Sequence, residues 1–220
     1  MRRALILGAS GGIGAALVAA LEARGSAVTG LSRSATGLDL TDAASVARAA
    51  AQLSPPFDLI VNAAGALEIA GRGPEKRLAD IEAEAFTAQF ALNATGMALA
   101  LRHFAPLLGA PRPVFAGLTA RLGSIGDNAL GGWMAYRASK AAANQILRTA
   151  SVELARTRPG SVVVALHPGT VATPMTDRYA ANRPRLAPAE AAAGLLAVID
   201  RLTPADTGSF YDMRGLPIAW

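Results

Sequence analysis

Near its amino end the chain reads RALILGASGGIG over residues 3–14, and this stretch decides the fold. Five residues of strand character, 3–7, run directly into a glycine-rich turn, after which the apolar pattern becomes helical. Such a turn lets backbone N–H groups approach a pyrophosphate at the amino end of a helix, where the helix dipole favours negative charge. The pattern predicts a dinucleotide-binding βα turn, and a tight turn that binds nothing is the plainer interpretation. The residues expected to contact the dinucleotide here are Gly8, Ser10, Gly11, Gly12, Ile13 and Gly14.

The same turn contains Gly8-x-Ser10-x-Gly12, which is the nucleophile-elbow pattern of α/β-hydrolases. His103 or His167 could then serve as the base, since both follow the serine in the sequence. However, an elbow directly after the first strand would lack the earlier strands that supply the second N–H of the oxyanion hole. A phosphate loop belongs at that position. A serine hydrolase that uses Ser10 is therefore the least favoured of the three hypotheses that the sequence suggests. It predicts that a fluorophosphonate probe labels Ser10.

Beyond this turn, short apolar runs alternate with helical patterns, which is typical of a parallel sheet buried on both faces. We expect strands at 3–7, 27–31, 59–61, 113–117, 161–166 and 209–212, and helices at 13–24, 43–52, 84–107, 133–156 and 188–202. The sequence predicts an α/β fold in one domain, 1–220: a Rossmann-like, doubly wound parallel sheet of six to seven strands with helices on both faces. Residues 173–187 carry prolines and little periodicity, so we expect a loop or short helices over a site.

Composition argues against several classes of function. Cysteine is absent, and His103 and His167 lie far apart in the sequence, so we expect no metal site. The net charge of +5 comes mainly from scattered arginines, which favours a solvated surface over a nucleic-acid groove. No apolar run is long enough to span a membrane, and residues 8–12 interrupt the run that resembles a signal peptide. We therefore expect a cytoplasmic protein without nucleic-acid or membrane partners.

The end of the second expected strand bears on the choice of cofactor. About twenty residues after the glycine turn, NAD-binding folds place a carboxylate on the ribose 2′-hydroxyl, but this chain has Ser32 and Arg33. The Arg33 guanidinium is suited to a 2′-phosphate, so the sequence favours NADP(H) over NAD(H); an ordinary exposed arginine is the alternative. Asp39 and Leu40 follow, and the Asp39 carboxylate is expected within reach of adenine or at the N-cap of the next helix.

Tyr136 and Lys140 are the strongest catalytic candidates. They stand at i and i+4 on an expected helix, and therefore on one face of it. A nearby ammonium stabilises phenolate, so we expect it to lower the pKa of the tyrosine toward the range useful for acid–base catalysis. The chain has only two lysines, Lys76 and Lys140, which indicates a need for a compact ammonium at position 140. Earlier, at 62–65, the small residues of Asn-Ala-Ala-Gly would let a flat ring lie against the backbone.

Together these motifs resemble those of the short-chain dehydrogenase/reductase family. The glycine turn, Asn62-Ala63-Ala64-Gly65, Asn93, Tyr136-x-x-x-Lys140 and Pro168-Gly169 follow in the family's order and spacing over nearly the whole chain. The segment from Gly123 to Lys140 is most similar to the branch that contains C-factor and the sniffer-type carbonyl reductases. The resemblance implies hydride transfer between NADP(H) and a small-molecule carbonyl or alcohol substrate. It also implies a homodimer or homotetramer formed through the helices that start near Glu84 and Trp133.

The resemblance implies roles for single residues as well. Tyr136 would be the general acid and base, Lys140 would lower its pKa and bind ribose, and Asn93 would anchor a proton-relay water. The nicotinamide carboxamide would be contacted by the loop after the fifth strand, with Pro168, Gly169, Val171 and Thr173. The cofactor site would further include Asn62, Ala63, Ala64 and Gly65.

One position departs from the family pattern. The serine that binds the substrate oxygen usually stands thirteen residues before the tyrosine, which here is Gly123, so we assign the role to Ser124. Glycines at 123 and 126 would let the loop re-aim the hydroxyl. Thr119 is expected to lie too deep beside the end of its strand, and Ser139 to face the nicotinamide side. The alternative interpretation of Ser124 is a plain loop serine.

The sequence thus predicts an NADP(H)-dependent oxidoreductase in which Ser124 and Tyr136 bind the substrate oxygen and Tyr136 transfers the proton. A second hypothesis is a protein that keeps the dinucleotide site but serves signalling or assembly, because fold and cofactor do not fix function. The intact pair of Tyr136 and Lys140 argues against this second hypothesis.

Overall fold

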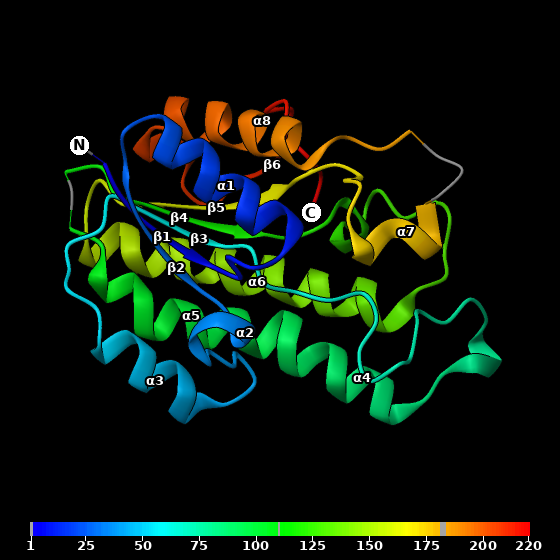
Figure 1. Cartoon of the computed structure of the whole chain (residues 1–220). Helices are drawn as coiled ribbons and strands as arrows, with labels where there is room; N and C mark the ends of the chain where they lie inside the picture. The colour runs from blue at the N-terminus through cyan, green and yellow to red at the C-terminus, as the bar shows by residue number, and fades with distance from the viewer. Residues whose placement is uncertain (1, 110, 181–183) are drawn as a thin grey trace.

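The centre of the molecule is a six-stranded parallel sheet in the order β2-β1-β3-β4-β5-β6 (Figure 1). It belongs to a computed structural model that describes residues 2–109, 111–180 and 184–220. The sheet confirms the predicted fold class, and each strand end lies within one residue of its expected position. The strands are β1 (Arg3–Leu7), β2 (Ala27–Leu31), β3 (Leu59–Asn62), β4 (Val114–Leu118), β5 (Val162–His167) and β6 (Phe210–Asp212).

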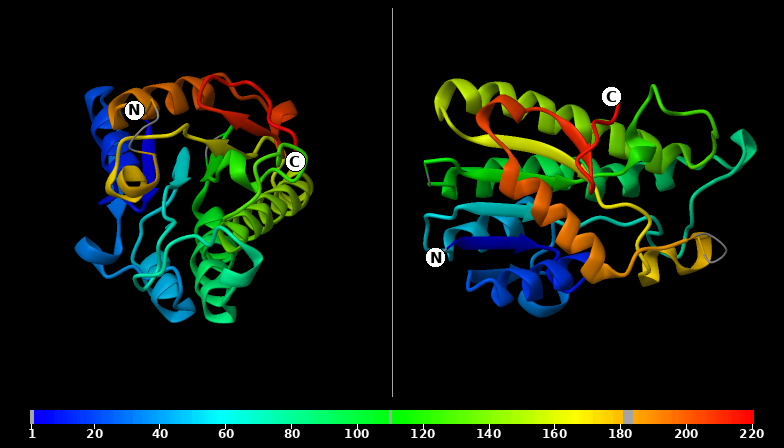
Figure 2. Two further views of the ribbon diagram at one scale, coloured as in Figure 1. Left: turned by 90° about the vertical axis from the view of Figure 1, so that its right-hand side faces the viewer. Right: turned by 90° about the horizontal axis from the view of Figure 1, so that it is seen from above.

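Helices cover both faces of this sheet (Figures 1 and 2). On one face lie α1 (Gly12–Ala23) and α8 (Pro188–Arg201), and on the other α3 (Ala43–Ala51), α5 (Gly96–Phe104) and α6 (Met134–Thr157). Successive strand residues alternate between the two apolar clusters: Leu5 packs on the α5 and α6 side, whereas Ile6 packs on the α1 and α8 side. Because both faces are covered, a strand such as β4 is buried at every position.

The single helix expected over 84–107 is wrong in detail. The chain forms α4 (Ala83–Phe90), a π-helical turn (Ala91–Thr95), α5 and a 3₁₀ turn (Ala105–Leu107). In the π turn the Gly96 N–H donates to the carbonyl of Ala91, five residues back. Periodicity could not indicate this change, because inserting one residue into a helical turn leaves the apolar pattern on both sides intact. The turn carries Asn93 into the interior.

Two short helices flank the carboxyl edge of the sheet. α2 (Arg33–Thr36) was not expected; it begins where the Ser32 hydroxyl accepts the Ala35 N–H at 3.2 Å and ends at Gly37, whose φ is 72°. α7 (Pro174–Ala180) lies in the segment expected to form a loop or short helices. Residues 181–183 of that segment lie outside the described residues.

The order of the strands creates a switch point. From β1 the chain goes to β2 on one side and then to β3 on the other, so the connections diverge at the carboxyl ends of β1 and β3. Open α/β sheets bind ligands at such a point. The segments after β3, β4 and β5 extend beyond this edge together with α7, on the right of Figure 1. Within the described ranges, no helix has both the length and the hydrophobicity that a transmembrane span requires.

Candidate active site

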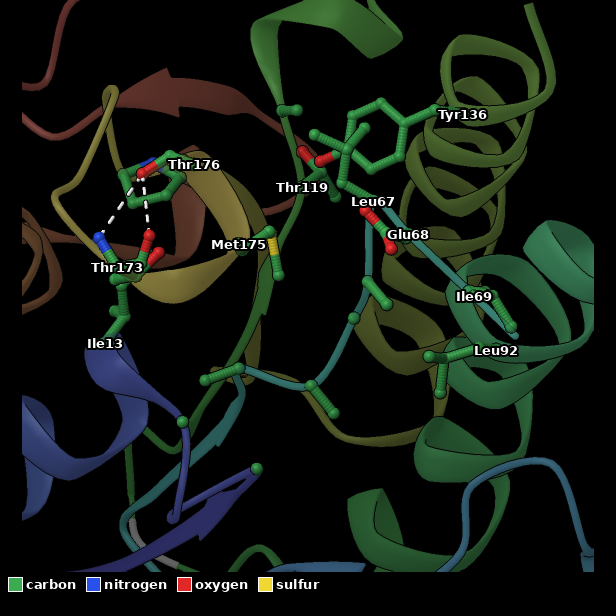
Figure 3. A pocket seen from close by; sticks show the side chains of 18 of the residues that line it. Ile13, Leu67, Glu68, Ile69, Leu92, Thr119, Tyr136, Thr173, Met175 and Thr176 are labelled. Atoms are coloured by element: carbon green, nitrogen blue, oxygen red, sulfur yellow. Dashed lines mark hydrogen bonds between the residues drawn. The ribbon is translucent and has the colours of Figure 1, made fainter. Parts of the chain in front are cut away.

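A cavity of about 1370 Å³ opens at the carboxyl edge of the sheet. Its walls come from the glycine turn, α2, the segments after β3, β4 and β5, the start of α6, and α7 (Figure 3). The volume exceeds what a single small ligand fills, since ligand pockets usually measure about 300–1,000 Å³. The cavity can therefore hold a large ligand at one end and a smaller one at the other.

The glycine turn lies at one end of this cavity. All six of its predicted contact residues line the wall, namely Gly8, Ser10, Gly11, Gly12, Ile13 and Gly14. A Cβ at Gly14 would lie 2.1 Å from the Gly8 carbonyl oxygen, so only glycine permits this tight turn. Within the described part of the chain, no side chain caps α1 at Gly11, so the first N–H groups of the helix have no side-chain partner there. These features fit a pyrophosphate cradle.

The residues expected around a 2′-phosphate and adenine lie nearby. Ser32, Arg33, Asp39 and Leu40 all line the cavity. Arg33 stands on the first turn of α2, and the Ser34 hydroxyl donates to that of Ser10 at 3.1 Å, which joins α2 to the glycine turn. The Asp39 carboxylate accepts the Thr41 hydroxyl and N–H at 2.7 and 2.8 Å, and these bonds hold its pKa below the usual value. A guanidinium and an ionised carboxylate therefore stand at this end of the cavity.

The segment after β3 contributes Ala63, Ala64 and Gly65 to the wall, whereas Asn62 is not among the described lining residues. Asn62 is buried; its Oδ1 accepts the Ala64 N–H at 3.1 Å and its Nδ2 donates to the sulfur of Met97. It therefore shapes the segment from behind. A Cβ at Gly65 would come within 3.0 Å of both the Asn93 Oδ1 and the Lys140 Nζ, so a small residue here lets those groups reach the wall.

Tyr136 and Lys140 share one face of α6, as their spacing predicted. Tyr136 lines the cavity, while Lys140 is buried, with its Nζ 5.8 Å from the centre of the tyrosine ring and donating to the Leu118 carbonyl at 3.4 Å. Burial lowers the pKa of Lys140 to about 8. Burial also raises the pKa of Tyr136, which is the opposite direction to the lowering expected from a neighbouring ammonium. The phenol is protonated at neutral pH.

The side chain of Asn93, in the π turn, contacts three other residues. Its Oδ1 accepts the Ala66 N–H at 3.1 Å, and its Nδ2 donates to the Ala66 carbonyl at 3.0 Å and to the Gln89 Oε1 at 2.6 Å. The Ser139 hydroxyl stands 3.3 Å from the same Nδ2. Asn93 therefore ties the segment after β3 to α4 and α6, and the structure brings it close to Lys140 but not onto the described cavity wall.

The structure separates Ser124 from the cavity. Its buried hydroxyl accepts the Asp127 N–H at 3.1 Å and donates to the terminal Trp220 carbonyl at 3.5 Å, and Ser124 is not among the described lining residues. Thr119, by contrast, lines the cavity with Tyr136, so the expectation that it lies too deep is wrong (Figure 3). The Thr119 hydroxyl is buried without a hydrogen-bond partner in the described structure. Spacing along the sequence could not place these two hydroxyls, because the chain turns through a 3₁₀ helix, Arg121–Gly123, shortly after β4 ends.

The loop after β5 lines the cavity with the four residues predicted from sequence, Pro168, Gly169, Val171 and Thr173. The Thr176 hydroxyl holds this loop by accepting the Thr173 N–H at 3.3 Å and donating to the Thr173 carbonyl at 3.1 Å (Figure 3). His167 also lines the cavity. Its Nδ1 has no described partner, and burial lowers its pKa to about 4.

Apolar and aromatic side chains form the opposite end of the cavity. Trp133 meets Tyr136 edge-on at 6.4 Å between ring centres, and it meets Tyr179 at 5.6 Å. Tyr179 and Arg178 of α7 both bind the carboxylate of Glu68, which follows β3. α7, which helps to line the cavity, is thus fastened to the segment after β3. The sequence offered no spacing from which the pairing of residues 68 and 178, far apart in the chain, could be inferred.

A doubly wound sheet with a glycine-rich first turn and a large cavity at its switch point defines a dinucleotide-binding α/β protein. The sequence model of the family described as short chain dehydrogenase matches residues 34–184. The chain therefore belongs to the short-chain dehydrogenase/reductase family, whose members are oxidoreductases.

Individual relatives agree with the predicted branch of the family. The chain is 33% identical to 1-hydroxy-2-glutathionyl-2-methyl-3-butene dehydrogenase of Rhodococcus sp. (strain AD45), over 84% of this chain and 79% of that protein. It is 38% identical to C-signal of Myxococcus xanthus, over 75% of this chain and 93% of that one. Among solved structures, the NADPH-bound carbonyl reductase from chicken fatty liver has a TM-score of 0.84 at 24% identity, covering 100% and 99% of the two chains. This last similarity shows the fold alone.

Proposed function

We propose that residues 1–220 form one dinucleotide-binding and catalytic domain that transfers hydride between NADP(H) and a carbonyl or alcohol substrate. The observation that carries the proposal is the position of Tyr136: its protonated phenol faces the cavity, with Lys140 behind it on the same helix. A cavity that continues from this phenol to the glycine turn can hold cofactor and substrate together. The NADPH found in the structural neighbour from chicken liver supports the choice of cofactor.

The residues around the cavity suggest how the cofactor would be held. The N–H groups at the start of α1 would bind the pyrophosphate, and Arg33 would bind a 2′-phosphate. Asp39 would lie toward adenine, and the loop with Pro168, Gly169, Val171 and Thr173 would lie along the nicotinamide. When bound, NADPH supplies the hydride that reduces the carbonyl carbon.

The chain's own contribution is to bind the carbonyl oxygen and to move a proton. The Tyr136 phenol would donate a hydrogen bond to that oxygen and then its proton, as general acid. The Thr119 hydroxyl, and not that of Ser124, would donate the second hydrogen bond, because it lines the cavity and has no described partner of its own. Lys140 would reprotonate the Tyr136 phenolate through an ordered water anchored by Asn93, and its lowered pKa suits proton exchange near neutrality.

The proposal is tested by a panel of aldehydes, ketones and quinones, with the loss of NADPH absorbance as the readout. We expect at least one class to be turned over by the parent protein. Oxidation of NADPH that is not matched by the reduced product, an alcohol or a hydroquinone, would contradict the proposal.

A second candidate function is signalling, since one relative is named C-signal. A protein with this role would bind the dinucleotide without turning over any member of the panel. Calorimetric titration with NADPH beside the activity assay distinguishes the two functions.

A further inference from the structure

The start of α6 lacks the local signals that usually begin a helix. Positive φ angles occur at three successive residues, 65° at Gly131, 66° at Gly132 and 57° at Trp133. Trp133 is the N-cap residue, and its side chain makes no capping hydrogen bond. No acidic residue stands in the first turn of the helix. Nevertheless this turn carries Tyr136, the third residue of the helix. The local sequence therefore does not by itself fix the orientation of the proposed catalytic phenol.

Glu75 supplies the missing contacts from another part of the chain. Its carboxylate accepts the backbone N–H of Ala135, and its backbone carbonyl accepts the N–H of Trp133 at 2.6 Å. One residue thus satisfies two of the N–H groups that the helix start leaves without intrahelical partners. The negative charge also lies at the positive end of the helix dipole. Glu75 stands 60 residues before Ala135, so this cap is a tertiary contact.

The cap also holds the side chain that packs against the phenol. Trp133, whose backbone N–H donates to the Glu75 carbonyl, meets the rings of both Tyr136 and Tyr179 edge-on. Glu75 belongs to the segment after β3, whose residues from Ala63 to Ala70 line the cavity. A displacement of Glu75 would therefore reach Tyr136 through both the backbone of α6 and the Trp133 ring.

We propose that Glu75 is a positioning residue for Tyr136, acting as a remote cap that sets the first turn of α6 without touching the substrate. The inference rests on the proposed function for its kinetic consequence. A positional error of about 1 Å in a catalytic group can cost on the order of 100-fold in rate. The required property of position 75 is a side-chain acceptor at the right distance, which glutamine retains and alanine lacks.

The test uses three variants of position 75 in the full-length protein. For Glu75→Ala we expect kcat to fall by roughly 10- to 100-fold with the Kd for NADPH within about twofold of the parent. Glu75→Gln should recover turnover to within about threefold, and Glu75→Asp, with a shorter reach, should fall between them. Glu153→Ala is the matched control, since Glu153 is an exposed glutamate on the distal part of the same helix.

A spectroscopic readout separates this proposal from the proposed function. The chain has two tryptophans, so a Trp220→Phe background leaves Trp133 as the single indole reporter at the start of α6. In that background Glu75→Ala should shift the Trp133 emission, whereas Glu75→Gln and Glu153→Ala should not.

If Glu75→Ala fails to fold, Glu75→Asp replaces it in the comparison with Glu75→Gln. Unchanged emission and turnover in Glu75→Ala, or a glutamine variant as impaired as alanine, would overturn the proposal. Failure of the parent to reduce any carbonyl would instead contradict the proposed function.

Discussion

Two hydroxyl-bearing residues, Thr119 and Ser124, differ in what surrounds their oxygen atoms. The Ser124 hydroxyl already has two partners within the protein, while the Thr119 hydroxyl is buried on the cavity wall with no partner among the residues that the structure describes. A buried polar atom without a partner costs free energy, and a ligand that supplies the missing hydrogen bond recovers it. The geometry therefore favours Thr119 as the donor to the substrate oxygen.

Thr119→Val tests this assignment because valine keeps the shape and removes the hydroxyl. Loss of one donor to a developing oxyanion typically costs about 10²–10³ in turnover, so we expect a fall of that order at saturating NADPH. Ser124→Ala should remain within several-fold of the parent. The opposite ranking of the two variants would restore the assignment of Ser124 that the sequence suggested.

The buried charge of Lys140 makes the free energy of unfolding depend on pH. Burial lowers its pKa in the folded protein to about 8 from 10.5, so the folded state releases this proton at lower pH than the unfolded chain does. Between these values the unfolded state binds more protons, and stability due to this group rises with pH. Below pH 8 the buried ammonium opposes folding.

Lys140→Met makes this prediction measurable, because methionine is apolar and of similar length. The free energy of unfolding of the parent, relative to the variant, should increase by roughly 3 kcal/mol as the pH rises from 7 to 10.5, at about 1.4 kcal/mol per pKa unit. Urea titrations of both proteins at several pH values measure the difference. A difference that stays constant over this range would mean that Lys140 titrates normally.

At the scale of elements, the short helix α2 presents the residue that would choose the cofactor. Ser32 caps this helix and Arg33 begins it, beside the glycine turn. A charge-assisted hydrogen bond contributes about 1.5–3 kcal/mol, so the parent should prefer NADPH over NADH by roughly 10- to 150-fold. Arg33→Ala should remove most of this preference while leaving NADH affinity nearly unchanged. Equal affinities in the parent, measured by calorimetric titration, would contradict the role of Arg33.

Elements were predicted from sequence where the periodicity was strong. The strands and long helices follow from apolar spacing, and the first βα turn follows from its glycines, as at Gly8 and Gly14. The sequence did not predict α2, because a single turn of helix has no measurable period. It did not predict the π turn at Ala91–Thr95 either, because a one-residue insertion leaves the flanking apolar pattern unchanged. Element type was thus predictable where many residues share one face.

At the scale of the whole molecule, the site depends on tertiary contacts that spacing along the chain does not encode. The i, i+4 relation placed Tyr136 and Lys140 together because both lie on one helix. The spacing does not place Ser124 in the same way, because its distance from Tyr136 is set by the path of a connecting segment. The contacts of Glu75 with α6, and of Glu68 with α7, likewise join segments far apart in sequence.

The central claim is that the Tyr136 phenol transfers the proton in a carbonyl reduction that uses NADPH. Tyr136→Phe keeps the ring and its contacts with Trp133 and removes the hydroxyl. The most direct measurement is single-turnover oxidation of NADPH by the parent and by Tyr136→Phe, with the best substrate of the panel. We expect the rate to fall by at least about 10²-fold in the variant, with NADPH affinity retained. A phenylalanine variant that reduces the substrate at a near-parental rate would contradict the account.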